Sequence, residues 1–165
     1  VEQPAALTLT LTHSDVLCHG DSTGNASATA GGGTSPYSYV WSDSQIGPNA
    51  IGLAQGTYTV TVTDSNGCQI SDSVVISEPT SPLVVNVNVV ESCSNEAAGD
   101  ATANVSGGTP VYSYLWNTGA TVPSITGLAP GTYTVTVVDS NGCDVTVTEA
   151  INGLATPNSG FTISR

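Results

Sequence analysis

Apolar and polar residues alternate with a period of two along most of this chain. In residues 7–12 leucine alternates with threonine, and in residues 57–63 tyrosine or valine alternates with threonine. Tyr37, Tyr39 and Trp41 fall on one face of another segment with the same period. Successive side chains of a β-strand point to opposite sides of the sheet, so the pattern predicts strands with one buried and one solvated face.

Turn signals separate these segments at short intervals. Residues 31–36 and 52–56 are rich in glycine, and residues 64–67 read Asp-Ser-Asn-Gly, in which Asn-Gly supplies the positive φ of a tight turn. Each half of the chain therefore holds about six or seven short strands. This number and spacing predict an all-β fold of antiparallel β-sandwiches with an immunoglobulin-like shape.

The chain repeats itself at an offset of 75 residues. Between the first and second cysteines, and between the third and fourth, 27 of 51 positions are identical with no insertion. Copies of this length are too long for a solenoid repeat and long enough to be small domains. We predict one sandwich in residues 1–78, a second in residues 79–153 and a C-terminal tail in residues 154–165.

One strand of the second copy departs from this offset. Leu11 would align with Asn86, but the apolar face of the second copy holds Val85 and Val87. A slip of one residue moves every side chain of a strand to the opposite face. We therefore expect a β-bulge or a one-residue change in the loop before Cys93.

The four cysteines form one pair in each copy, Cys18 with Cys68 and Cys93 with Cys143. Three pairings are possible, and the duplication favours these two, which would place one disulfide within each domain. Each bridge would close a loop of about 50 residues and stabilise its domain by roughly 4 kcal/mol. Paired cysteines indicate an oxidising compartment, and none has the C-x-x-C spacing of a zinc site.

The charge balance excludes several kinds of partner. The formal net charge is −12, with 13 acidic residues, no lysine and a single arginine at position 165. Nucleic acids and anionic membranes require clustered lysine and arginine, so neither is expected as a partner. No apolar run reaches membrane-spanning length, so we predict no membrane insertion. We expect a secreted protein whose export signal was removed or lies outside this segment.

No catalytic constellation is recognisable. His13 and His19 are the only histidines, and they have no counterparts in the second copy. A catalytic triad needs a positioned nucleophile and an orienting acid, and the sequence suggests neither. No nucleophile elbow, metalloprotease helix or phosphate loop is present, so we predict that the protein is not an enzyme.

The aromatic residues offer a weak carbohydrate-binding signal. Trp41 and Trp116 could stack on sugars, but their phase with the neighbouring tyrosines predicts core positions. Tyr37 and Tyr112, which follow the glycine-rich loops, are the better candidates for contact with a ligand.

The Asp-Ser-Asn-Gly turns also have the oxygen-rich composition of a calcium loop. Calcium is the one cofactor that the sequence suggests, although the further acidic ligands of an EF-hand are missing and a hairpin turn explains the same residues. The candidate calcium ligands are Asp64, Asn66, Asp139 and Asn141. Further oxygens would have to come from Asp15, Asp21, Glu96 and Asp100.

The combined motifs resemble the SprB repeat, a family found in very large cell-surface adhesins of gliding and other Bacteroidota. In the first copy the resemblance rests on Gly-Gly-Thr at residues 32–34, Tyr-Ser-Tyr-Val-Trp at residues 37–41, the run over residues 53–68 and a closing Glu-Pro at residues 78–79. The second copy matches at the corresponding positions as far as Cys143. The resemblance covers almost all of residues 1–153, and the family supplies no catalytic residues.

The resemblance implies a secreted, surface-exposed protein that works in adhesion or as an extracellular filament. The implied partners are other copies of itself joined head to tail, neighbouring repeats, a surface polysaccharide or a ligand on a host or substrate. A carbohydrate-binding accessory domain of a secreted protein is the alternative. A strand at residues 161–163 or at residues 7–11 could add to a sheet edge of the next subunit, and the tail suggests a complete two-domain subunit.

The resemblance to Bacteroidota proteins also suggests glycosylation. Ser22 and Ser73 fit the Asp-Ser/Thr pattern of O-glycosylation in these bacteria. Asn25 and Asn104 fit the N-linked sequon, which matters only in a suitable host.

Overall fold

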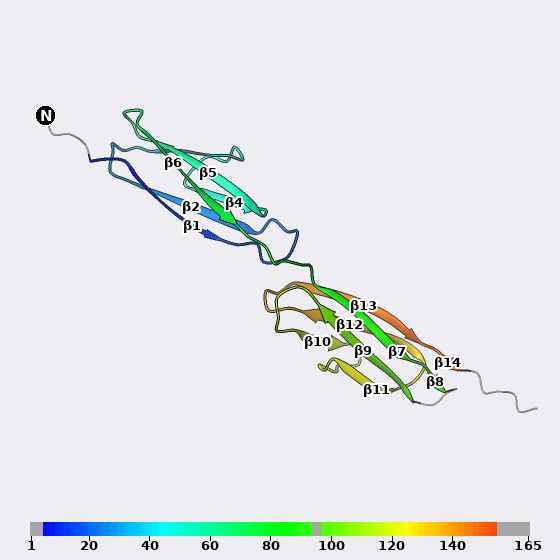
Figure 1. The fold of residues 1–165 in the computed structure, drawn as a ribbon. Helices are drawn as coiled ribbons and strands as arrows, with labels where there is room; N and C mark the ends of the chain where they lie inside the picture. Colours follow the sequence, from blue (N-terminus) through cyan, green and yellow to red (C-terminus); the bar gives the residue numbers. More distant parts are fainter. Residues whose placement is uncertain (1–4, 94–96, 155–165) are drawn as a thin grey trace, which may run out of the picture. The chain divides into compact units, whose positions relative to one another are not determined.

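The structure, a computed structural model, describes residues 5–93 and 97–154, and none of these residues is helical. The chain divides into two compact units, the first ending at Pro82 and the second beginning at Leu83 (Figure 1). The predicted all-β class is confirmed. The predicted tail lies outside the described residues except for Leu154, and so does the strand expected at residues 161–163.

The first unit is built from two antiparallel sheets with three strands each. One sheet has the order β1-β2-β4 and the other the order β3-β5-β6. The strands are β1 (Thr8–Ser14), β2 (Gly24–Gly31), β3 (Ser38–Trp41), β4 (Asn49–Leu53), β5 (Gly56–Thr63) and β6 (Gln69–Ile76).

The second unit repeats this plan with the sheets β7-β9-β11 and β10-β12-β13, and it adds a short parallel pair, β8-β14. Its strands are β7 (Val84–Val90), β8 (Ser92–Cys93), β9 (Gly99–Ser106), β10 (Ser113–Trp116), β11 (Ser124–Leu128), β12 (Gly131–Val138), β13 (Asp144–Ile151) and β14 (Gly153–Leu154).

Strand β5 shows why the alternating pattern folds in this way. Val60 and Val62 are fully buried, whereas the threonines that alternate with them face the solvent side of the sheet. On that outer side Thr61 Oγ1 lies 2.9 Å from Ser71 Oγ of the paired strand β6. Hydroxyl pairs of this kind stabilise neighbouring strands without burying an unsatisfied polar group.

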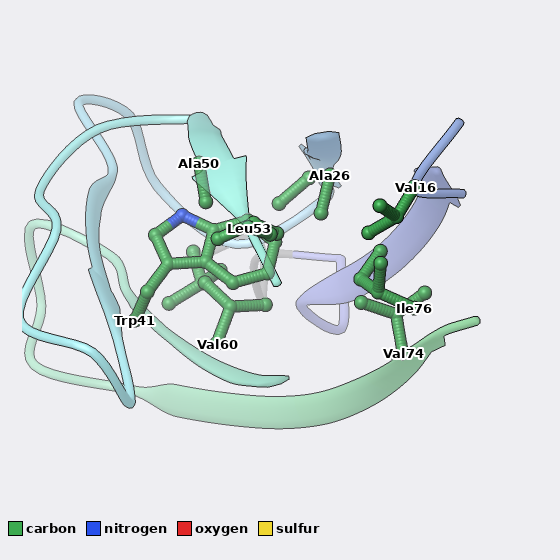
Figure 2. Close-up of a cluster of buried hydrophobic side chains, with 10 residues drawn as sticks. Val16, Ala26, Trp41, Ala50, Leu53, Val60, Val74 and Ile76 are labelled. Atoms are coloured by element: carbon green, nitrogen blue, oxygen red, sulfur yellow. The ribbon is translucent and has the colours of Figure 1, made fainter. Parts of the chain in front are cut away.

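The core of the first unit lies between its two sheets. Figure 2 shows the indole ring of Trp41 among Ala50, Leu53 and Val60. Trp41 comes from one sheet, whereas Ala50 and Leu53 come from the other, so the unit is a sandwich that shares one core between two layers. The second unit has an equivalent core around Trp116, which is 1% exposed.

The register of β7 confirms the slip that the sequence predicts. Leu11 pairs with Ala28 in the first unit, whereas Val87 pairs with Ala103 in the second, so this strand is offset by one residue more than the rest of the repeat. The shift keeps the leucines and the valines on the same side of their sheets, which is the side that packs on the core.

The compensating change lies in the loop before Cys93. The N–H of Val16 donates to the carbonyl of Ser77 at 2.9 Å, and the N–H of Ser92 donates to the carbonyl of Asn152 at 3.2 Å. These two bonds mark equivalent positions in the two units. Leu17 stands between this bond and the next cysteine in the first unit and has no counterpart in the second.

Candidate functional site

Asp64 organises the turn between β5 and β6. Its Oδ1 accepts hydrogen bonds from the N–H groups of Asn66 and Cys68, both at 2.9 Å, and its Oδ2 accepts one from the N–H of Thr34 at 2.9 Å. Asn66 Nδ2 also donates to Thr34 Oγ1 at 2.8 Å. One carboxylate, 6% exposed, thus ties the turn to the glycine-rich loop.

Asp139 does the same in the second unit. Its Oδ1 accepts from the N–H groups of Asn141 and Cys143 at 2.9 Å each, and its Oδ2 accepts from the N–H of Thr109 at 2.8 Å. The equivalence extends to single atoms, so this turn is a repeated structural device.

Backbone hydrogen bonds lower the pKa of both carboxylates. Burial raises the pKa of Asp64, but the bonds from the N–H groups of Thr34, Cys68 and Asn66 outweigh it, and the pKa is lowered from its ordinary value. Asp139 shows the same balance: burial raises its pKa, but the bonds from the N–H groups of Thr109, Cys143 and Asn141 outweigh this effect, and the pKa is lowered. Both side chains are therefore ionised at neutral pH.

The carboxylate oxygens of Asp64 and Asp139 accept hydrogen bonds from backbone N–H groups. An aspartate that stabilises a hairpin turn makes bonds of this kind. Among the described residues, no group of three or more histidine, cysteine, aspartate or glutamate side chains is placed to hold a metal ion. Asp15, a predicted further ligand, lies at the other end of the first unit, where its Oδ1 accepts from the N–H of Ser77. The structure therefore does not bring Asp15 together with Asp64.

The cysteines of the first unit are not paired as the duplication suggested. Cys68 is an exposed free thiol, whereas Cys18 and Cys143 are both disulfide-bonded. The expected bridge between Cys18 and Cys68 is therefore wrong.

The strand geometry explains the error in the first unit. Cys68 immediately precedes β6, whereas the loop that holds Cys18 is bonded to residues just after β6, where the N–H of Gly20 donates to Glu78 Oε2 at 2.7 Å. A strand of this length spans roughly 25 Å. The Cα atoms of a disulfide are only about 4 to 7 Å apart. The two cysteines therefore cannot meet.

The second unit has the same arrangement. Cys143 immediately precedes β13, whereas Cys93 pairs in β8 with Leu154, which follows β13. In both units the duplication placed one cysteine at each end of a long strand. The duplication therefore suggested pairs of cysteines that lie at opposite ends of β6 or β13.

The chain enters each unit at one end and leaves it at the opposite end, and we call these the entry end and the exit end. At the entry end of the first unit the N–H of Gly33 donates to the carbonyl of Ala5 at 2.7 Å, and a hollow of about 250 Å³ is lined by the incoming chain, Asp64, Asn66 and Cys68. At the entry end of the second unit Leu83 lies beside Asp139, since both approach Gly108. The exit ends hold Cys18 and Cys93.

At the exit end of each unit, a glutamate side chain accepts a hydrogen bond from the backbone of a neighbouring segment. The sequence did not predict these contacts. Glu78 accepts from the N–H of Gly20 and lies 3.3 Å from His19 Nδ1. In the second unit Glu91 accepts from the N–H of Asn152. The closing Glu-Pro at residues 78–79 was the available signal, but it was used only as part of the family resemblance.

The aromatic side chains are structural. Trp41 is 2% exposed, and its Nε1 donates to the carbonyl of Gly47 at 3.0 Å. Tyr37 and Tyr112 are half-buried, and their hydroxyls donate to the carbonyls of Gly32 and Gly107. These tyrosines are half-buried rather than exposed, and their hydroxyls hold the glycine-rich loops, so their contact with a ligand stays a prediction.

The predicted glycosylation positions are all on the surface. Ser22 lies in the loop between β1 and β2, and Ser73 lies on the outer face of β6. Asn25 and Asn104 are exposed residues of β2 and β9. Their modification stays a prediction.

The comparison with protein families decides the relationship. The sequence profile of the SprB repeat matches residues 10–45 and again residues 87–121. The chain contains two SprB repeats. Each match runs from inside the first strand of a unit to just beyond the tryptophan strand, β3 or β10. The SprB repeats therefore coincide with equivalent parts of the two sandwiches, and the predicted resemblance is confirmed.

Similarity to other known proteins is distant. No curated protein is detectably similar in sequence. The C-terminal 282-residue fragment of intimin, in complex with the intimin-binding domain of its translocated receptor, matches at 13% identity and a TM-score of 0.48. The match covers 90% of this chain, which spans 64% of that fragment. The amphioxus IgVJ-C2 molecule matches at 13% identity and a TM-score of 0.31, over 92% of this chain and 98% of that one.

Neither TM-score establishes a common fold, so the fold assignment of the SprB repeats rests on their strand order and cores. Within the part of the chain that the structure describes, there is no apolar helix of bilayer-spanning length.

Proposed function

We propose that this protein is an extracellular structural or adhesive module, either part of a cell-surface adhesin or the subunit of an extracellular filament. The observation that carries the proposal is the pair of tandem SprB repeats, each with its own sandwich core. The disulfide-bonded state of Cys18 and Cys143 supports an extracellular location, because disulfides persist in oxidising compartments.

The charge supports exposure to bulk solvent. With 13 acidic residues and one basic residue, the surface favours solubility and the accumulation of cations. The buried tryptophans leave few aromatic surfaces for sugar stacking, so a carbohydrate-binding role receives no support from the structure.

Microscopy of the native material tests the proposal. Gold-labelled antibodies against the chain should decorate the outside of intact cells, on appendages or filaments. Labelling restricted to the cytosol, together with reduced cysteines in freshly alkylated extracts, would contradict it.

We further propose that residues 155–165 take part in assembly. Deleting them leaves β14 (Gly153–Leu154) and both sandwich cores intact, so the variant should fold but no longer assemble into filaments. Replacing the same residues with an equally long Gly-Ser segment controls for length. Normal filaments from either variant would remove the tail from the mechanism.

A further inference from the structure

The turn between β5 and β6 and the turn between β12 and β13 each contain an asparagine followed by a glycine. The two pairs are Asn66-Gly67 and Asn141-Gly142. Asparagine deamidates most readily before glycine, because glycine has no side chain that shields its backbone nitrogen from the asparagine side chain. In an unfolded chain, both pairs are therefore expected to react.

Deamidation needs water and no other reagent. The backbone nitrogen of the glycine loses its proton to base and attacks Cγ of the asparagine. The new C–N bond closes a succinimide ring, and the side-chain nitrogen takes up a proton and leaves as ammonia. Water then adds to one of the two ring carbonyls and opens the ring to aspartate or isoaspartate. The glycine N–H and the asparagine amide must therefore both be free to move.

In the first unit, hydrogen bonds hold both of these groups. The N–H of Gly67 donates to the carbonyl of Asp64 at 3.0 Å, and Asn66 Nδ2 donates to Thr34 Oγ1 at 2.8 Å. The N–H of Asn66 also donates to Asp64 Oδ1 at 2.9 Å. The attacking nitrogen thus keeps its proton in a hydrogen bond, and the amide is held by a hydroxyl of the glycine-rich loop.

The second unit makes the same three bonds. The N–H of Gly142 donates to the carbonyl of Asp139 at 3.1 Å, and Asn141 Nδ2 donates to Thr109 Oγ1 at 3.0 Å. The N–H of Asn141 donates to Asp139 Oδ1 at 2.9 Å. Asn141 is half-buried, whereas Asn66 is exposed to water. The hydrogen bonds, and not exclusion of water, are therefore what the two turns share.

We propose that Asn66 and Asn141 are deamidation sites that the fold keeps unreacted, and that Thr34 and Thr109 are the positioning residues that hold their side-chain amides. Reaction then requires the turn to open. Its rate is that of the unfolded chain multiplied by the fraction of molecules in which the turn is open. The inference does not depend on the proposed function, because it concerns the chemistry of each folded unit.

The reaction weakens the turn in which it occurs. Isoaspartate at position 66 adds a methylene to the backbone between the N–H groups of Asn66 and Cys68, which Asp64 Oδ1 binds together. Both products replace the amide that donates to Thr34 by a carboxylate, and they place a second negative charge near Asp64. The modified turn therefore opens more readily than the original one, and the change is not reversed.

Mass spectrometry of the full chain measures both reactions in one sample, since each adds one dalton to its own peptide. Chymotrypsin separates the two turns, because tyrosines precede both of them and the chain has no lysine. After incubation in mildly alkaline buffer, both turns of the folded wild type should react more slowly than in urea that unfolds the chain, by about tenfold or more.

Two variants use one unit as the control for the other. Thr34→Val removes the hydroxyl that holds Asn66, so the rate at Asn66 should rise about fivefold while the rate at Asn141 in the same molecule stays unchanged. Thr109→Val should reverse this result. Thr34→Ser keeps a hydroxyl at that position and should retain the slow rate of the wild type, even if Thr34→Val disturbs folding of the first unit.

Three results would overturn the inference. The first is equal rates in the folded and the unfolded wild type, which would mean that the fold gives no protection. The second is an unchanged rate at Asn66 in Thr34→Val, or an equal rise at both turns, because the hydroxyl would then have no local effect. The third is the same acceleration in Thr34→Ser as in Thr34→Val, which would assign the effect to packing of the threonine methyl group.

Discussion

At the scale of single residues, Asp64 and Asp139 each fix a turn and a loop of their unit. Each is buried and accepts three backbone N–H bonds that join a β-turn to a distant glycine-rich loop. The glycine at the closest approach is also constrained. A Cβ on Gly33 would lie 2.8 Å from Asp64 Oδ2, and its φ of +54° is one that other residues rarely adopt.

Replacing the carboxylate should weaken the first unit. We expect Asp64→Asn to lower the thermal midpoint by on the order of 5 to 10 °C, because an amide presents an N–H₂ group to backbone donors that need an acceptor. The matched control is Asp21→Asn, which makes the same charge change at an exposed residue and should shift the midpoint little. Equal shifts would show that the charge and not the bonds matters.

The lowered pKa values predict how stability depends on pH. A carboxyl group whose pKa is lower in the folded state stabilises the fold above its unfolded pKa of about 3.9. That contribution is lost as the pH falls through the lower folded pKa values of Asp64 and Asp139. We expect the urea midpoint to fall steeply below about pH 4. The double variant Asp64→Asn, Asp139→Asn should show a shallower decline over the same range, and an identical slope would contradict this origin.

At the scale of strands, close packing between the sheets depends on small residues. Gly24 begins β2 where the chain passes Ile76 at the end of β6, and a Cβ there would lie 2.6 Å from Ile76 Cγ2 and 2.8 Å from the carbonyl oxygen of Leu53. Gly99 occupies the same place in the second unit, 2.8 Å from Ile151 Cγ2. The edge of each core is thus closed by backbone rather than by a side chain.

A substitution at Gly24 tests this close approach. We expect Gly24→Ala to lower the free energy of unfolding by about 3 kcal/mol, because the neighbouring backbone oxygen cannot move away. Gly31→Ala, at the other end of β2, is the control. Its Cβ would meet only Thr8 Oγ1 at 3.0 Å, which a side-chain rotation relieves. Urea denaturation of the two variants measures the difference, and a larger loss at Gly31 would contradict the packing argument.

At the scale of the whole molecule, the chain consists of two compact units, each with its own sheets and its own core. A unit that has a core of its own can fold by itself. The two repeats are therefore expected to unfold as separate units.

Single-molecule stretching from the two termini in the presence of a thiol reductant tests this expectation. Two unfolding events should appear, one for each repeat, because each repeat has its own core. Cys68→Ser is the control and should behave as the wild type, because Cys68 is a free, exposed thiol. A single unfolding event for the whole chain would contradict the independence of the two repeats.

The sequence by itself determined the local structure of this protein. Period-two alternation produced the strands and their buried faces, Asn-Gly produced the turns, and the one-residue slip of β7 could be read from Val85 and Val87. These features depend on residues that are neighbours in the sequence or across one turn. The SprB family relationship was likewise visible in the motifs alone.

Only the tertiary structure decided the long-range chemistry. The duplication suggested that Cys18 pairs with Cys68, but strand β6 holds their backbones at opposite ends of the unit. The tyrosines beside the glycine-rich loops were expected to be exposed, but their hydroxyls bond to those loops. In each case the outcome depends on which residues the fold brings close together. An alternating pattern predicts which side chains of a strand are buried, but it does not predict what lies beside the ends of that strand.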